Sequence, residues 1–163
     1  MRAATRIGLV AAVMCLATPT LTAEAAAVNS RTVVLPLNGT FEEPGAEPID
    51  ITGSIRVRVV TRTEPGRGGT AHIVSTLQRT TGTGEDTGAT YRFAGTDVAF
   101  RTFPPVPVTP LDINPVFLKF WPPTPILPPH PVRPVNVEVT LAADGTINAI
   151  TAEVGNGSPP PQP

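Results

Sequence analysis

The prolines between residues 104 and 134 constrain this chain more than any other feature. This segment holds 12 prolines in 31 residues. Proline fixes φ and has no N–H to donate, so it ends helices and is excluded from strands that pair on both sides. We therefore expect no helix and no central strand in 104–134, but an extended, polyproline-like backbone.

Apolar and aromatic side chains lie between these prolines, which is unusual for a linker. The densest run is "VFLKFW" at 116–121, which could itself add a short edge strand. Soluble monomers avoid exposing so large an apolar patch unless it is an interaction site. We predict that Phe117, Phe120 and Trp121 pack across a sheet as a lid, with the remaining prolines covering the domain or offered to a partner, and take these three as candidate binding residues.

The remainder of the chain after residue 28 predicts antiparallel strands. In 49–63 apolar residues alternate with threonine, serine and arginine, which is typical of a half-buried strand. The segment 31–41 contains Pro36 and predicts an edge strand or two pieces. The segment 70–80 predicts the return strand of a hairpin, with Ile73 and Leu77 inward.

Two further segments carry turn or break signals. In 89–103 the apolar phase changes after Gly95, which predicts a bulge or strand break with Val98 and Phe100 then facing inward. In 134–154 the Asp144-Gly145 dipeptide predicts a hairpin turn. We therefore predict an all-β fold, a small antiparallel sandwich or barrel of about six or seven strands, as a single domain over 28–154 with the proline-rich segment 104–134 inserted.

The N-terminal residues predict that the protein is exported, and the C-terminal residues predict a disordered tail. Residues 1–25 combine early arginines, a short apolar stretch and small residues, which is the layout of a secretory signal peptide. The apolar stretch is shorter than the roughly 20 residues that span a bilayer, so we expect no transmembrane segment after cleavage and a secreted or periplasmic protein. Residues 155–163 are polar and proline-rich, and we expect them to be disordered.

The predicted signal peptide also predicts where the mature chain begins. We expect the mature chain to begin between Glu24 and Val28, because small residues follow the apolar stretch there. Cleavage at this point also removes Cys15, the only cysteine. Intact mass spectrometry of the exported protein measures the new terminus. An exported chain that still contains Met1–Ala17 would contradict both the signal peptide and the localisation.

Residues 54–93 resemble a pattern in small secreted bacterial all-β proteins of unknown function. The run "SIRVRVVTRTEPGRGGTAHIVSTLQRTTGTGEDTGATYRF" has a strand ending in Thr-x-Thr, a glycine-rich loop, a histidine-bearing strand, a Gly-x-Gly turn and "TGxxYR". The resemblance covers about forty residues. It implies an exported all-β domain and brings no activity with it.

Residues suited to catalysis are few and scattered. His72 lies on the expected outward face of its strand, and His130 stands between two prolines, so neither has neighbours at metal-ligand spacing. Asp97 beside the phase change is the one carboxylate that could be buried, although such an aspartate more often bonds local backbone. We therefore assign no catalytic residue, no metal and no cofactor.

These observations favour a secreted, non-catalytic β-domain with a binding or structural role. The 12 basic and 13 acidic residues are nearly balanced and form no long run, so we expect no nucleic-acid partner. An unknown protein or a cell surface remains the possible partner. The alternatives are a hydrolase of unrecognised type that uses Asp97 or His72, and a carrier that holds a small apolar ligand.

Overall fold

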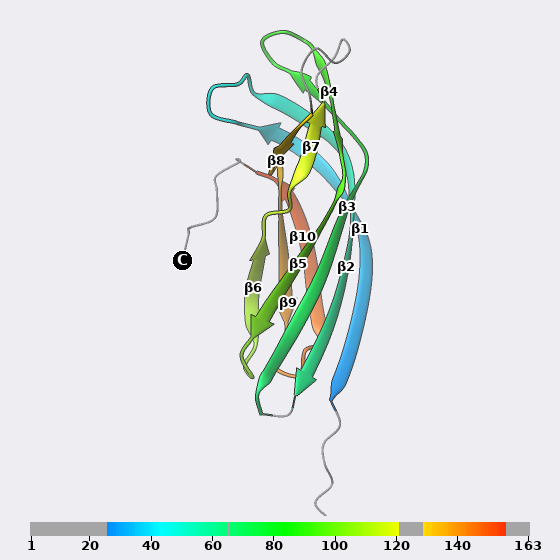
Figure 1. Cartoon of the computed structure of the whole chain (residues 1–163), viewed down its shortest axis with the longest axis vertical. Coiled ribbons are helices and arrows are strands. Elements are labelled where there is room, and N and C mark those ends of the chain that lie inside the picture. The colour runs from blue at the N-terminus through cyan, green and yellow to red at the C-terminus, as the bar shows by residue number, and fades with distance from the viewer. Residues whose placement is uncertain (1–25, 65, 121–128, 156–163) are drawn as a thin grey trace, which may run out of the picture.

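The protein is an all-β molecule of two antiparallel sheets (Figure 1). The computed structural model describes residues 26–64, 66–120 and 129–155. The strands are β1 (Ala27–Phe41), β2 (Ile49–Glu64), β3 (Gly68–Gly84), β4 (Thr90–Ala94), β5 (Thr96–Phe103), β6 (Val108–Ile113), β7 (Phe117–Phe120), β8 (His130–Val132), β9 (Val135–Leu141) and β10 (Ile147–Val154).

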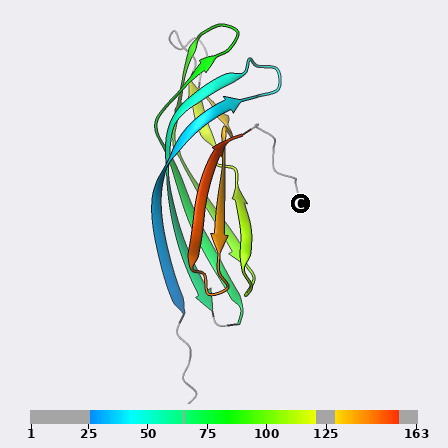
Figure 2. The same cartoon turned by 180° about the vertical axis from the view of Figure 1, so that it is seen from behind.

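The two sheets face each other as a sandwich, which confirms the predicted fold class. The larger sheet runs β1-β2-β3-β4-β7-β8 with β5 also paired to β3, and the smaller sheet runs β10-β9-β6. Figure 2 shows the smaller sheet lying against the concave side of the long strands. The described residues hold ten strands rather than six or seven, because the proline-rich segment contributes three and 89–103 divides into two.

Strand β2 sets the two faces of the larger sheet. Ile55, Val57 and Val59 are fully buried against the smaller sheet, whereas Arg56 and Arg58 between them are exposed. Burying one such aliphatic side chain stabilises the fold by about 1.5–3 kcal/mol, so the strand cannot slip by one residue without exposing its whole apolar set. The alternation predicted for this segment is confirmed.

Strand β3 is long enough to pair with two strands on the same side. Its residues 80–83 pair with β4, and its residues 69–76 pair with β5. Gly95 joins β4 to β5 with φ 134°, a conformation that side chains disfavour. The break predicted at this glycine is therefore present.

The inward face predicted for β5 is wrong. Val98 and Phe100 are 49% and 69% exposed, and the buried residues of this strand are Ala99 and Phe103. The buried residues are odd-numbered in both β4 and β5, so the face that is buried stays the same across Gly95. Two apolar side chains consequently lie on the outer face of the sheet.

The proline-rich segment belongs to both sheets instead of lying across them. Strand β6 pairs with β9 at the edge of the smaller sheet, and β7 pairs with both β4 and β8. The expectation of no central strand is therefore wrong at β7. The four residues of β7 contain no proline, and the prolines that do fall in strands, Pro36, Pro110 and Pro131, lie in the edge strands β1, β6 and β8.

Polar contacts tie the smaller sheet to the larger one at the β9–β10 turn. The hydroxyl of Thr61 donates to the Gly145 carbonyl at 2.6 Å, and that of Thr63 donates to the Asp144 carbonyl at 3.2 Å. A Cβ on Gly145 would lie 2.5 Å from the Thr63 Cγ2 atom, so the close approach requires glycine. Arg31 of β1 also donates to the carbonyls of Ile147 and Asn148.

Some predicted features fall on other parts of the chain. The signal peptide of residues 1–25, Trp121 and the tail from residue 156 lie outside the described residues. Within the described ranges, no helix has the length and apolar character needed to cross a membrane.

Candidate functional site

The predicted binding residues Phe117 and Phe120 lie on opposite faces of β7. Phe117 is 1% exposed and belongs to the core between the sheets. Phe120 is half-buried and stands opposite Arg92 of β4 on the outer face. Trp121 lies outside the described residues. The binding role of these three residues therefore stays a prediction.

The hydrolase candidates His72 and Asp97 do not meet. His72 lies on the outer face of β3, where its ring stacks on Phe100 with centroids 4.4 Å apart and planes at 5°. Asp97 is half-buried on the opposite face, across from Ser75 in the register. The Ser75 Oγ is buried without a hydrogen-bond partner in the described part of the chain. A Ser-His-Asp arrangement needs all three groups on one side, which this register prevents.

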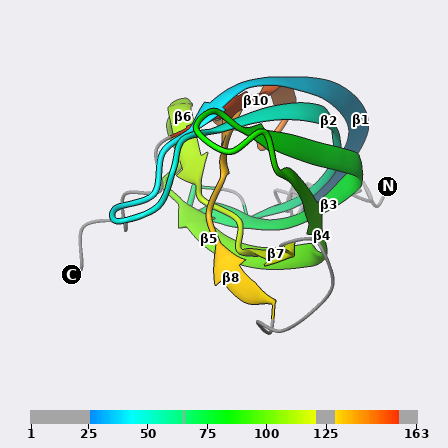
Figure 3. The ribbon, with the colours of Figure 1, turned by 90° about the horizontal axis from the view of Figure 1, so that it is seen from above.

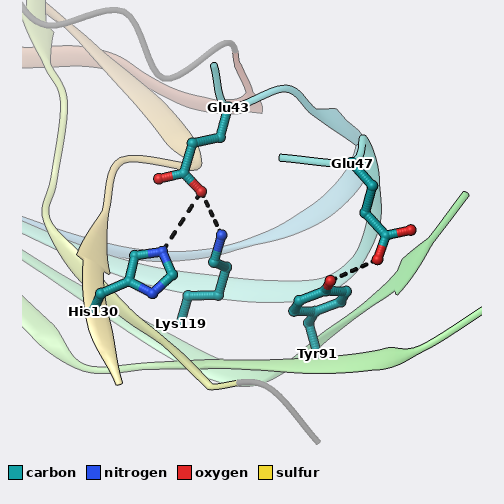
Figure 4. Close-up of polar contacts among 5 residues, drawn as sticks. All are labelled: Glu43, Glu47, Tyr91, Lys119 and His130. Atoms are coloured by element: carbon teal, nitrogen blue, oxygen red, sulfur yellow. Dashed lines mark hydrogen bonds and ion pairs between the residues drawn. The ribbon is translucent and has the colours of Figure 1, made fainter. Parts of the chain in front are cut away.

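A polar network closes one end of the sandwich around Lys119 (Figure 4). Lys119 of β7 is 3% exposed, and its Nζ donates to Glu43 Oε2 from the β1–β2 loop. His130 of β8 places Nε2 3.6 Å from the same Glu43 oxygen. The Lys119 Nζ also lies 5.9 Å from the centroid of the Tyr91 ring. A buried ammonium group needs such partners, because desolvation penalises a charge that has none.

Glu47 anchors the same loop to the turn between β3 and β4. Tyr91 donates its hydroxyl to Glu47 Oε1 at 2.6 Å, and the Thr87 hydroxyl donates to that oxygen at 2.7 Å. The backbone N–H groups of Asp86 and Thr87 donate to Oε2 at 3.1 and 3.0 Å. These donors hold the pKa of Glu47 below its ordinary value, the Tyr91 hydroxyl contributing most.

The polar contacts at this end of the sandwich hold the β1–β2 loop against β4 and β7. Burial first, and the Glu47 carboxylate second, raise the pKa of Tyr91, so its hydroxyl keeps its proton. The ion pair of Lys119 with Glu43 connects β7 to the β1–β2 loop. The described residues contain no group of three His, Cys, Asp or Glu able to hold a metal ion.

Sequence reasoning missed this network, although one signal was present. Because side chains alternate along a strand, an inward Phe117 places Lys119 inward as well. A lysine at an inward position needs a partner for its ammonium group, and a carboxylate is the strongest one, so the pattern alone suggests that such a partner exists. The partner does not follow, since Glu43 is 76 residues away along the chain.

The outer face of the larger sheet carries an apolar patch. In register, Val60 of β2 lies opposite His72 of β3, and His72 lies opposite Phe100 of β5. The neighbouring row contains Val74 and Val98. We call these five residues the outer patch: Val60, His72, Val74, Val98 and Phe100.

Arginines of β2 border the outer patch. Arg58 lies opposite Val74, and Arg62 lies opposite Thr70. In the orientation that satisfies both groups, the Gln78 amide oxygen accepts from Arg56 Nη2 at 2.8 Å. Neither Arg58 nor Arg62 forms an ion pair with any described residue.

A shallow hollow continues the patch towards the β2–β3 hairpin. It encloses about 270 Å³ and is lined by Arg62, Glu64, Arg67, Gly68, Gly69, Thr70, Thr102 and Phe103. The outer patch, its arginines and this hollow together form one surface that is apolar in the middle and bordered by arginines along β2.

Comparison with known proteins finds no family model, no curated protein and no solved structure that matches this chain. The resemblance of residues 54–93 to secreted bacterial proteins therefore stays a prediction.

Proposed function

We propose that this protein is an exported, non-catalytic binding domain that uses the outer patch as its recognition surface. The observation that carries the proposal is Phe100, a phenylalanine 69% exposed in the middle of a strand and stacked on His72. Large exposed apolar groups of a folded domain mark interaction sites when they gather in a patch. Aromatic and arginine side chains are also those that contribute most at protein interfaces.

The charges around the patch define a complementary partner. Arg58 and Arg62 have no ion-pair partner in the described part of the chain, so they are available to carboxylates of another molecule. Opposite charges across an interface steer association and fix its register. The partner that fits is a polypeptide with acidic side chains around aromatic or aliphatic ones.

Two observations favour binding over the alternative functions. A hydrolase based on His72 and Asp97 would require them on the same face, and β3 and β5 hold them on opposite faces. A carrier would require room between the sheets, where β2 and β9 instead bury valines and isoleucines at 0–1% exposure. Both observations therefore favour the outer face as the surface that binds a partner.

Binding of an acidic aromatic polymer tests the proposal. We expect fluorescently labelled poly(Glu,Tyr) to bind the protein at low salt, as measured by anisotropy, with weaker binding as salt screens the arginines. Phe100→Ser and Arg58→Glu should each weaken binding about tenfold. Arg92→Glu, the same charge change on an exposed residue of β4, should have little effect.

Two outcomes would contradict the proposal. One is binding of poly(Glu,Tyr) that Phe100→Ser and Arg58→Glu leave unchanged, or no binding at all. The other is turnover of an esterase, peptidase or glycosidase substrate that His72→Ala abolishes, which would place the hydrolase alternative first. His72→Ala on its own should leave the fold intact, because the side chain lies on the outer face.

A further inference from the structure

Strand β5 has a free edge. It pairs with β3 on one side, and no described strand pairs with its other side. Figure 3 shows β5 and β1 on opposite sides of the sandwich. An unpaired strand edge is a template for another strand, and natural proteins protect such edges or use them.

The sequence of this edge is self-complementary. Read in both directions from Ala99, the strand presents valine against phenylalanine, aspartate against arginine and threonine against threonine. In an antiparallel pair of two such strands centred on Ala99, Val98 lies opposite Phe100 of the second strand, and Asp97 lies opposite Arg101. Aromatic–aliphatic and opposite-charge pairs of this kind are those that stabilise adjacent strands.

No described strand bonds to the backbone groups on this edge, and one of them is bonded by a side chain of β5 itself. The Phe100 carbonyl accepts Arg101 Nη1 at 3.0 Å, so a side chain occupies the position that a neighbouring strand's N–H would take. Neither Asp97 nor Arg101 forms an ion pair with a described residue. In the single chain, Arg101 thus bonds a carbonyl that a second strand would use, and it must release this carbonyl when the strands pair.

We propose that a second copy of this chain pairs with β5 through the same strand, antiparallel and centred on Ala99. Val98 and Phe100 then exchange backbone hydrogen bonds across the two-fold axis, and the Ala99 residues form the closer, non-hydrogen-bonded pair. Asp97 of each copy meets Arg101 of the other. The larger sheets of the two copies become one continuous sheet.

A second copy fits this edge better than an unrelated strand. An unrelated strand would need aspartate, valine, phenylalanine and arginine at matching spacing, and β5 itself supplies that order. The two-fold axis repeats each favourable pair, as an isologous interface requires. The inference goes beyond the binding role of the outer patch, and it places two outer patches side by side on one sheet.

Exchange of the two charges tests the proposal. We expect sedimentation equilibrium of the full-length protein to show a dimer. Asp97→Arg and Arg101→Asp should each weaken dimerisation about tenfold or more, because each creates like-charge pairs twice in the dimer. The double variant Asp97→Arg/Arg101→Asp should restore it, since the opposite charges meet again. Arg92→Asp is the matched control on β4 and should not change the dissociation constant.

A cysteine at the two-fold axis tests the register. In a Cys15→Ser background, Ala99→Cys should give a disulfide-linked dimer on mild oxidation, since closely spaced antiparallel pairs lie within disulfide range. Val34→Cys, which is 55% exposed on the far strand β1, should not. Circular dichroism of every variant separates a lost interface from a lost fold.

Three outcomes would overturn the proposal: a wild-type protein that sediments as a monomer, single charge changes without effect, or equal cross-linking at positions 34 and 99. A monomer that still binds poly(Glu,Tyr) leaves the proposed function standing. A dimer that does not bind the polymer removes the proposed function alone.

Discussion

Phe117→Ala is expected to lower the free energy of unfolding by about 3–5 kcal/mol, the usual cost of truncating a buried phenylalanine. Phe117 is 1% exposed and lies in the core between the sheets. Its removal takes away buried apolar area and leaves a cavity that β4 and β8, hydrogen-bonded on both sides of β7, prevent from collapsing. Urea unfolding followed by circular dichroism measures the change.

The neighbouring residue provides the control. Leu118→Ala changes an apolar side chain that is 40% exposed, so its cost should be about 1 kcal/mol or less. Equal effects of the two substitutions would mean that Phe117 does not fill the core. A Phe117→Ala protein that keeps its stability and loses only a binding activity would return this residue to the binding site predicted from the sequence.

Glu43→Leu is expected to cost about 2–4 kcal/mol, because it leaves the Lys119 ammonium buried without its carboxylate. Lys119 is 3% exposed, whereas the Glu43 side chain is 27% exposed. The two partners should therefore respond differently. Lys119→Met removes the buried charge itself and keeps the volume, so its cost should stay within about 1 kcal/mol.

The double variant Glu43→Leu/Lys119→Met completes the cycle. It should be more stable than Glu43→Leu alone, because neither charge remains to be desolvated. Glu42→Leu, at the exposed neighbouring position, controls for the change of side-chain type. If Glu43→Leu were as mild as Glu42→Leu, the network in Figure 4 would not carry the stability assigned to it.

The strands of local hairpins could be predicted from the sequence, because their signals are local. The alternation in 49–63 and the Asp144-Gly145 turn each depend on a few adjacent residues, and both predictions agree with β2 and with the β9–β10 hairpin. The number of strands was underestimated. Proline density hides β6 and β8 and allows β7 only as a possible edge strand, since it describes an average over the segment while β7 needs only four proline-free residues.

The facing of β5 could not be derived from composition. The spacing of the apolar residues Val98 and Phe100 is that of an inward face, although both are exposed. The residue that is buried, Ala99, is small and contributes little to the hydrophobic pattern. Which face is buried depends on where the smaller sheet lies, and that is a long-range property. For the same reason the candidate site differs from the predicted one. The sequence pattern predicts that both Phe117 and Phe100 pack inward, and the structure buries Phe117 but exposes Phe100.

The bonds from Arg31 to the β9–β10 hairpin join residues 116 and 117 positions apart in the chain. The contacts of β1 can therefore be completed only after β10 has been synthesised. Contacts between distant parts of a chain slow folding, since a long loop must close before they form. The β2–β3 hairpin can assemble early and locally, whereas the contact of β1 with β10, which lie in different sheets, forms late, after both sheets are in place.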